Sequence, residues 1–246
     1  MSVPLTLAFG QFRWSATWFM TLLTVAAVSA FIGLGRWQWH RAAQARALYA
    51  RFAAGRDTVH DYPAGAAQTL PRYAQVRVQG RYDGAHQFLL DNMSDHDMPG
   101  YQVLTPLQLT DGRTLIVNRG WIPLTESRRD LPDIRIDGAD PPAAVGRLDN
   151  LPVPAISLGH GAPPPGPQWP KLTSFPTMAD LSAALGRPLE PRQLLLNANQ
   201  PLGYVRDWQP PGMSPDQHLS YAIQWWGFAT VAAGLFVFLN RRRQPR

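Results

Sequence analysis

One histidine of this sequence stands at the start of a long apolar segment, with two aromatic residues beyond it. In "SPDQHLSYAIQWW", residues 214–226, Tyr221 and Trp225 follow His218 by three and seven positions, so the three share one face of a helix. The dipole at a helix N-terminus disfavours a charged imidazole, and the neutral ring is the form that ligates metals. A flat apolar cofactor could lie against these residues. The alternative is that His, Tyr and Trp are simply what a membrane interface collects.

Other templates for chemistry are missing from the sequence. It has no G-x-G-x-x-G, P-loop, H-E-x-x-H or G-x-S-x-G motif, and no cysteine, which excludes disulfides, cysteine–zinc sites and thiol catalysis. We therefore expect no catalytic residues, no metal site made of protein side chains and no enzymatic activity. The polar cluster at 95–97 is interpreted as a solvated loop tip, and His40 as interfacial surface. The other histidines carry no pattern: His60, His86 and His160.

The net charge of +6 is concentrated at the two ends of the chain. Five arginines lie outside residues 14–240, and within that range 18 basic residues nearly balance 17 acidic ones. A chain that tracks phosphates needs a basic stripe, which this distribution does not provide. The pattern excludes nucleic acid as a partner and is typical of segments that flank a membrane.

Two uncharged segments, residues 14–35 and 219–240, predict transmembrane helices. Each has 22 residues, which as a helix reach about 33 Å and cross the apolar part of a bilayer. A cleaved signal peptide is the alternative for the first, since "AAVSA" at 26–30 resembles a cleavage site. The apolar run continues beyond it to Leu34, so we expect the segment to remain as an anchor.

The basic cluster Arg241–Arg243 predicts a cytoplasmic C-terminus, and two spans then place the N-terminus on the same side. We expect a protein of the cell inner membrane with its central domain in the periplasm. The predicted order is a cytoplasmic N-terminus at 1–13, a transmembrane helix at 14–35, a helical extension at 36–55, a periplasmic β-rich domain at 56–218, a transmembrane helix at 219–240 and a cytoplasmic basic tail at 241–246.

The central region predicts a mainly antiparallel β domain with one short helix, which makes the fold class α+β. Short β-rich runs alternate with turn signals at Gly84, Pro99-Gly100 and Asp111-Gly112, the last of which predicts a tight hairpin. The predicted strands lie in "YAQVRVQGRY", "HQFLLDN", "YQVLTPLQL", "RTLIVNRGWIPL", "AAVGRL" and "RQLLLNANQ". Residues 150–170 are rich in proline and predict an irregular loop.

The short helix is expected in "TSFPTMADLSAALGRPL", residues 173–189. Ser174 or Thr177 would cap it, and Gly186 followed by proline would end it. Its apolar face is expected to comprise Met178, Leu181 and Leu185.

Five segments, in order, resemble the Surfeit locus protein 1 family of assembly factors for haem-copper oxidases, in particular its bacterial members. "GRWQWHR" is similar to the family's G-x-W-Q-x-x-R, and "PRYAQVRVQGRYD" to its R-Y-x-x-V-x-V-x-G strand. "GYQVLTPLQL" and "LIVNRGWIP" resemble its G-Y-x-V-x-T-P and V-N-R-G-W segments. "QHLSYAIQWWGFA" is similar to the start of its second membrane helix.

This resemblance implies a chaperone-like, non-enzymatic role in the biogenesis of cytochrome c oxidase, respiratory complex IV. It implies that a transient haem a is held or handed to subunit I, with haem a synthase as a further partner and membrane lipid around the helices. His218 is the implied haem ligand, with Tyr221 and Trp225 beside it. A structural or partner-facing role is implied for Trp37, Gln38, Arg41, Arg119, Gly120 and Trp121.

Two other functions remain open from the sequence. One is a membrane scaffold that binds oxidase subunits without a cofactor, and the other is an accessory protein whose periplasmic domain binds a ligand. The first would yield a colourless protein even where haem a is made, and the second would need a partner to carry its signal.

Overall fold

The computed structural model describes residues 5–9, 12–55, 58–62, 70–125, 130–136, 143–153 and 161–243. The chain divides into two compact units, one made of Met1–Ala50 with Pro210–Arg246 and the other of Arg51–Gln209. The first contains most of the two long helices, and the second contains the main sheet. His160 and residues 154–160 of the predicted proline-rich loop lie outside the described residues.

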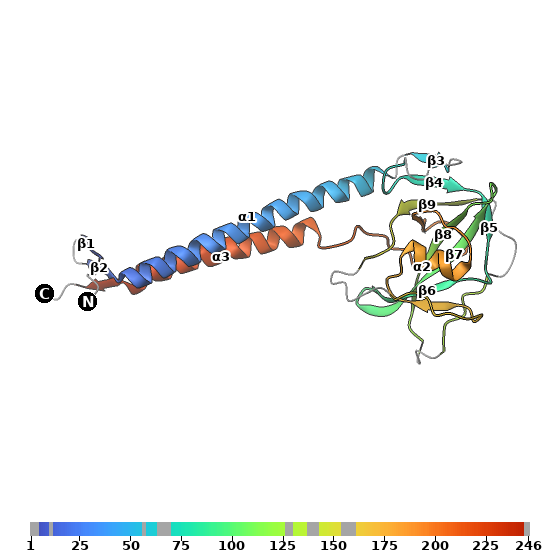
Figure 1. Ribbon diagram of the computed structural model, residues 1–246. Helices are drawn as coiled ribbons and strands as arrows, with labels where there is room; N and C mark the ends of the chain where they lie inside the picture. Colours follow the sequence, from blue (N-terminus) through green and yellow to red (C-terminus); the bar gives the residue numbers. More distant parts are fainter. Residues whose placement is uncertain are drawn as a thin grey trace. The chain divides into compact units, whose positions relative to one another are not determined.

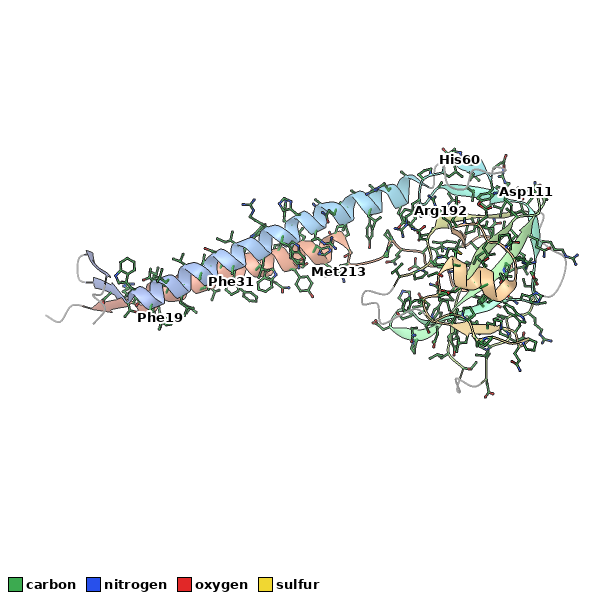
Figure 2. All side chains as sticks on the ribbon, viewed as in Figure 1. Phe19, Phe31, His60, Asp111, Arg192 and Met213 are labelled. Carbon is green, nitrogen blue, oxygen red and sulfur yellow. The ribbon has the colours of Figure 1, made fainter. Side chains whose placement is uncertain are left out.

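The two long helices are α1 (Trp18–Ala54) and α3 (Pro215–Leu239), which lie side by side and antiparallel (Figure 1). Both are long and apolar enough to cross a membrane, and their apolar side chains point outward: Phe19 is 69% exposed (Figure 2). α1 continues to Ala54, as predicted for the helical extension. It begins at Trp18 rather than Trp14, because residues 12–16 form a strand.

The start of α3 also differs from the predicted one. Ser214 caps the helix, its side chain accepting from the Gln217 amide while Gln217 accepts from the Ser214 amide, and Pro215 follows at the first helical position. The helix therefore begins at Pro215, four residues before Leu219. His218 lies in its first turn and not in front of it.

A small sheet that the sequence did not predict joins the two ends of the chain. It has the order β1–β2–β12, with β1 (Leu5–Phe9), β2 (Phe12–Ala16) and β12 (Arg241–Arg243), and all its pairs are antiparallel. The backbone of the arginine cluster thus pairs with a strand instead of forming a free tail. Both termini therefore lie at one end of the helix pair (Figure 1).

The second unit is built on a mixed sheet with the order β10–β6–β7–β8–β11–β9–β4–β3, to which β5 adds by pairing with β7. Its elements are β3 (Val59–Asp61), β4 (Gln75–Val78), β5 (Gly80–Tyr82), β6 (Phe88–Asp95), β7 (Met98–Leu109), β8 (Thr114–Pro123), β9 (Ala144–Asp149), β10 (Lys171–Thr173), α2 (Met178–Leu185) and β11 (Gln193–Leu196). All six predicted strand regions are present. Most pairs of the described sheet are antiparallel, as predicted, but β3–β4, β6–β10 and β8–β11 are parallel, so the sheet is mixed.

Two tight turns shape the central hairpins. Asp111-Gly112 joins β7 to β8 with Gly112 at φ +86°, as predicted. His96 and Asp97 join β6 to β7, both with positive φ, so the polar cluster at 95–97 is indeed an exposed loop tip. The prediction of a turn at Pro99-Gly100 was wrong: both residues lie within β7, and the turn just before them already reverses the chain.

The core of the second unit consists of side chains from the strands and from α2. Leu181 is fully buried against Phe88, Leu104 and Ile116, with Met178 and Leu185 packed beside it as predicted. Of the two proposed caps, the structure uses Thr177, in a reciprocal pair with Asp180, and Gly186 ends the helix at φ +69°.

Candidate functional site

The contact between α1 and α3, which we call the seam, is formed by stripes with the same spacing on both helices. In each stripe, successive residues are four, three and four positions apart. This spacing keeps one face of a helix turned toward its neighbour. Small residues let the backbones approach closely, and a Cβ added at Gly35 would overlap the Trp226 ring. The stripes are Phe31, Gly35, Gln38 and Ala42 on α1 and His218, Ala222, Trp225 and Ala229 on α3.

Gln38 and His218 are the polar pair within this apolar seam. Gln38 Oε1 lies 2.8 Å from His218 Nδ1, and the two residues are only 9% and 8% exposed. A carbonyl oxygen can only accept, so this contact is a hydrogen bond in the tautomer of His218 that carries its proton on Nδ1. In that neutral tautomer the other ring nitrogen, Nε2, has a free lone pair, the form in which imidazole ligates a metal.

Aromatic rings continue the seam about two helical turns beyond His218 along α3. Trp225 stacks on Phe31 at 5.8 Å between ring centroids, and Phe228 meets both rings at 5.9 and 5.8 Å. Trp225 lies about 20° from His218 around the helix, whereas Tyr221 lies about 60° away. Tyr221 is 45% exposed, so the structure groups Trp225 with His218 in the seam and turns Tyr221 outward.

The other predicted residues of the first motif do not reach the seam. Trp37 is 55% exposed, and Arg41 donates to Gln44 at 3.0 Å on the outer surface of α1. His40 is exposed and lies two positions from Gln38, about 200° around the helix, so it faces away from His218. Gln38 is thus the residue through which this motif contacts the histidine.

Arg119 lies in the interior of the β domain. It is 3% exposed and donates to Gln87 Oε1 at 2.9 Å and to the carbonyl oxygens of Leu202 and Ile134 at 2.6 and 3.2 Å. Its guanidinium lies over the Tyr204 ring, 4.9 Å from the centroid. Burial lowers the pKa of Arg119, as expected for a charge removed from water. These contacts tie Arg119 to several segments of the β domain.

Gly120 and Trp121 fix the segment that precedes the second long helix along the chain. Trp121 and Val205 exchange two backbone hydrogen bonds of 2.7 and 3.1 Å, and Tyr204 donates to the Arg119 carbonyl at 2.7 Å. Gly120 has φ +112°, and a Cβ there would overlap the Val205 carbonyl, so only glycine suits this position. The V-N-R-G-W segment therefore docks residues 202–206 onto β8.

A cavity of about 420 Å³ in the same domain has two arginines in its wall. Arg206 donates to the carbonyl oxygens of Asn197, Ala198 and Gln200 at 2.6–2.9 Å, and Arg147 to that of Phe52 at 3.0 Å. These guanidinium groups bind the protein's own backbone, which makes the cavity a weak candidate for anion binding. In the described part of the chain, no group of three or more His, Cys, Asp or Glu could hold a metal ion.

The sequence did not reveal the partnership of Gln38 with His218. One signal was available: Phe31, Gly35, Gln38 and Ala42 follow the spacing of a packed stripe, and the glutamine interrupts it with a polar group. Combined with a histidine on a second apolar helix, that interruption predicts a buried hydrogen bond between helices.

These features define a protein in which two helices apolar enough for a membrane flank a β domain along the sequence, and in which His218 is the one buried histidine among the described residues. The profile of the SURF1 family matches residues 25–230, and the chain belongs to the SURF1 family. It is also 28% identical over 254 aligned residues to a SURF1-like protein of Monosiga brevicollis, with 91% of this chain and 88% of that protein covered. Membership implies a role in cytochrome c oxidase assembly, and proteins of this family are assembly factors rather than catalysts.

Proposed function

We propose that this protein holds haem a during assembly of cytochrome c oxidase and releases it to subunit I, with His218 as the axial ligand. The observation that carries the proposal is the buried ring of His218, whose Nδ1 lies 2.8 Å from Gln38 Oε1. In the tautomer that donates to this oxygen, Nε2 is a lone-pair donor. Bound haem would supply an iron that such a nitrogen can coordinate. Haem a synthase and subunit I are the partners that this role requires.

The residues around His218 fit a flat apolar ligand. Trp225, Phe228 and Phe31 provide a cluster of rings about two turns from the histidine along the seam, and Tyr221 provides an exposed ring one turn away. His40 faces the other side of α1, so in the described chain His218 is the one histidine of the seam. A single protein ligand suits a carrier, because it is easier to give up than a pair.

We further propose that α1 and α3 span the cell inner membrane, with both termini in the cytoplasm and the β domain in the periplasm. The antiparallel arrangement of the helices and the pairing of β2 with β12 favour termini on one side. Arg241–Arg243 would hold that side in the cytoplasm. His218, in the first turn of α3, would then lie near the outer face of the bilayer.

A scaffold without a cofactor is the second candidate. The same contact favours it, since a histidine that is 8% exposed and hydrogen-bonded is also what a purely structural role produces. The two candidates differ in whether iron coordinates His218.

The test is the haem content of the full chain, purified in detergent from cells that make haem a. We expect haem with the wild type, and normal abundance with far less haem for His218→Ala. Because Gln38 would lose its partner in that variant, His218→Asn is the sharper change: its amide can still donate to Gln38 but offers no ring nitrogen. Tyr221→Phe should retain haem, since the ring remains.

His60→Ala, at an exposed position on β3, is the matched control, and His40→Ala tests the other histidine of α1. Full haem content in His218→Asn would favour the scaffold. Full content in the double variant of His40 and His218 would remove both from the mechanism. Deleting the gene should also lower oxidase activity. If a His218→Asn gene restored that activity fully in the deletion strain, oxidase assembly would not require haem binding at His218.

A further inference from the structure

We infer that Gln38 is a positioning residue that sets the tautomer and the ring orientation of His218, so that Nε2 is available to iron. The inference rests on the proposed haem role. The inference gives a function to Gln38, which would act on the iron only through His218. Gln38 lies on α1, 180 residues before His218 in the sequence.

The location of Gln38 is unusual for a glutamine. Its neighbours on the same stripe are Phe31, Gly35 and Ala42, and Ala42 is fully buried. A buried amide is unfavourable unless it is hydrogen-bonded, and an apolar residue would pack at such a position without that requirement. Among the described residues, the His218 ring is the side chain that hydrogen-bonds Gln38. The two helices thus keep a polar pair where apolar residues would also pack, which a functional use of the ring would explain.

The hydrogen bond selects one tautomer. In a free neutral histidine the proton resides mostly on Nε2, the nitrogen that a ligand must keep unprotonated. The Gln38 oxygen at 2.8 Å from Nδ1 reverses this preference, because an unprotonated Nδ1 would face it lone pair to lone pair. A neutral hydrogen bond of ordinary net strength changes the tautomer ratio by roughly two- to tenfold.

An amide also suits a ligand that must later release its iron. A carboxylate in this position would make the imidazole more basic and strengthen the bond to the metal. A neutral amide orients the ring with less of this effect. We therefore expect Gln38→Glu to retain haem more firmly than the wild type, and Gln38→Leu to hold it less tightly by about 10- to 100-fold, the range typical of partners behind a metal ligand.

The decisive measurement uses the haem-free full chain in detergent, with histidine ring nitrogens labelled by ¹⁵N. Protonated and unprotonated ring nitrogens have well-separated shifts, and the His218 signals are those missing from His218→Asn. We expect Nδ1 to be protonated in the wild type and a mixture of tautomers in Gln38→Leu. Gln38→Asn, which keeps the amide but withdraws it by one methylene, serves if the Leu variant does not fold. Gln44→Leu, at an exposed position of α1, is the matched control and should change nothing.

The outcomes separate this inference from the haem proposal. A proton on Nε2 in the wild type, or an unchanged tautomer in both Gln38 variants, overturns the positioning role whatever His218 binds. If the tautomer changes and haem affinity does not, while His218→Asn loses haem, the positioning role fails and the haem proposal stands. If His218→Asn binds haem normally, the haem proposal fails. The inference then fails too, even if the Gln38 variants change the tautomer of His218.

Discussion

The backbone of Gly35 lies directly against the indole ring of Trp226, so a side chain at position 35 would overlap that ring. Gly35 precedes Gln38 by one helical turn on the same stripe. The distance at which the two helices pack, and hence the hydrogen bond to His218, depends on the absence of a side chain there.

Replacing Gly35 with leucine should therefore push α1 and α3 apart. Overpacking of this kind costs about 1–3 kcal/mol of stability, and we expect a lower unfolding temperature in detergent together with loss of haem. Gly33→Leu is the control on the same helix, because a Cβ at Gly33 meets nothing within 4 Å. Equal behaviour of the two variants would show that the seam tolerates a wider spacing.

Replacing Arg119 with leucine should destabilise the β domain. The change would remove the Arg119 donor from the Leu202 carbonyl, and a buried group left unsatisfied costs about 1–3 kcal/mol. Gln87 Oε1 and the Ile134 carbonyl would each keep a donor, from Thr105 and from Gln87. Arg119→Lys should restore little, because one ammonium cannot replace a guanidinium spread over several acceptors. Denaturant unfolding measures the effect, and Arg135→Leu, in an exposed pair with Asp133, is the control.

The haem content per folded molecule should stay unchanged in Arg119→Leu, since the contacts of this residue lie within the β domain. If Arg119→Leu folded normally but lost haem, Arg119 would instead take part in haem binding.

Local sequence patterns predicted much of the β domain. Short β-rich runs between turn signals located β4, β7 and β8, and a cap followed by a glycine stop located α2, because these signals act within a few residues. The three-residue strands β3 and β10 were missed, since a short edge strand has no period of its own. The parallel pairing of β8 with β11 depends on a long connection, which no local pattern encodes.

The site was harder to predict for a different reason. A helix that is apolar enough to cross a membrane is apolar all round, so its pattern does not reveal which face contacts another helix. His218 could be selected by type and position, but its partner lies on α1, and the rotation of two helices about their axes is set only by packing. Tyr221 was grouped with His218 by spacing, but its side chain is exposed. A difference of about 60° around the helix is enough to place one residue in the contact and the other outside it.

Asp83 predicts a pH dependence of the β domain. Burial alone would raise the pKa of Asp83, but its bonds to His86 and Arg187 outweigh this and lower the pKa below the usual 3.8. A depressed pKa in the folded state means that this contribution is complete above about pH 4 and is lost as the pH falls further.

We therefore expect Asp83→Asn to reduce the free energy of unfolding at pH 7 by about 1–2 kcal/mol, and by much less at pH 3. Arg187 lies just after α2, so the loss should appear first as loosening of that helix, measurable by amide exchange. If the difference in free energy of unfolding between Asp83→Asn and the wild type increased as the pH fell, the pKa of Asp83 would not be lowered in the folded state.

The orientation of the chain in the membrane is the last prediction, because it decides which side of the bilayer His218 faces. The arginines of β12 favour a cytoplasmic end for the helix pair, and the β domain follows the opposite end of α1 along the chain. Alkaline phosphatase, which is active only after export, should therefore be active when fused at Gly161 and inactive when fused after Arg246. A fluorescent protein that folds only in the cytoplasm should give the opposite result at the same two positions. If activity appeared at Arg246 and not at Gly161, the chain would be inverted, and haem would have to reach His218 from the cytoplasmic face.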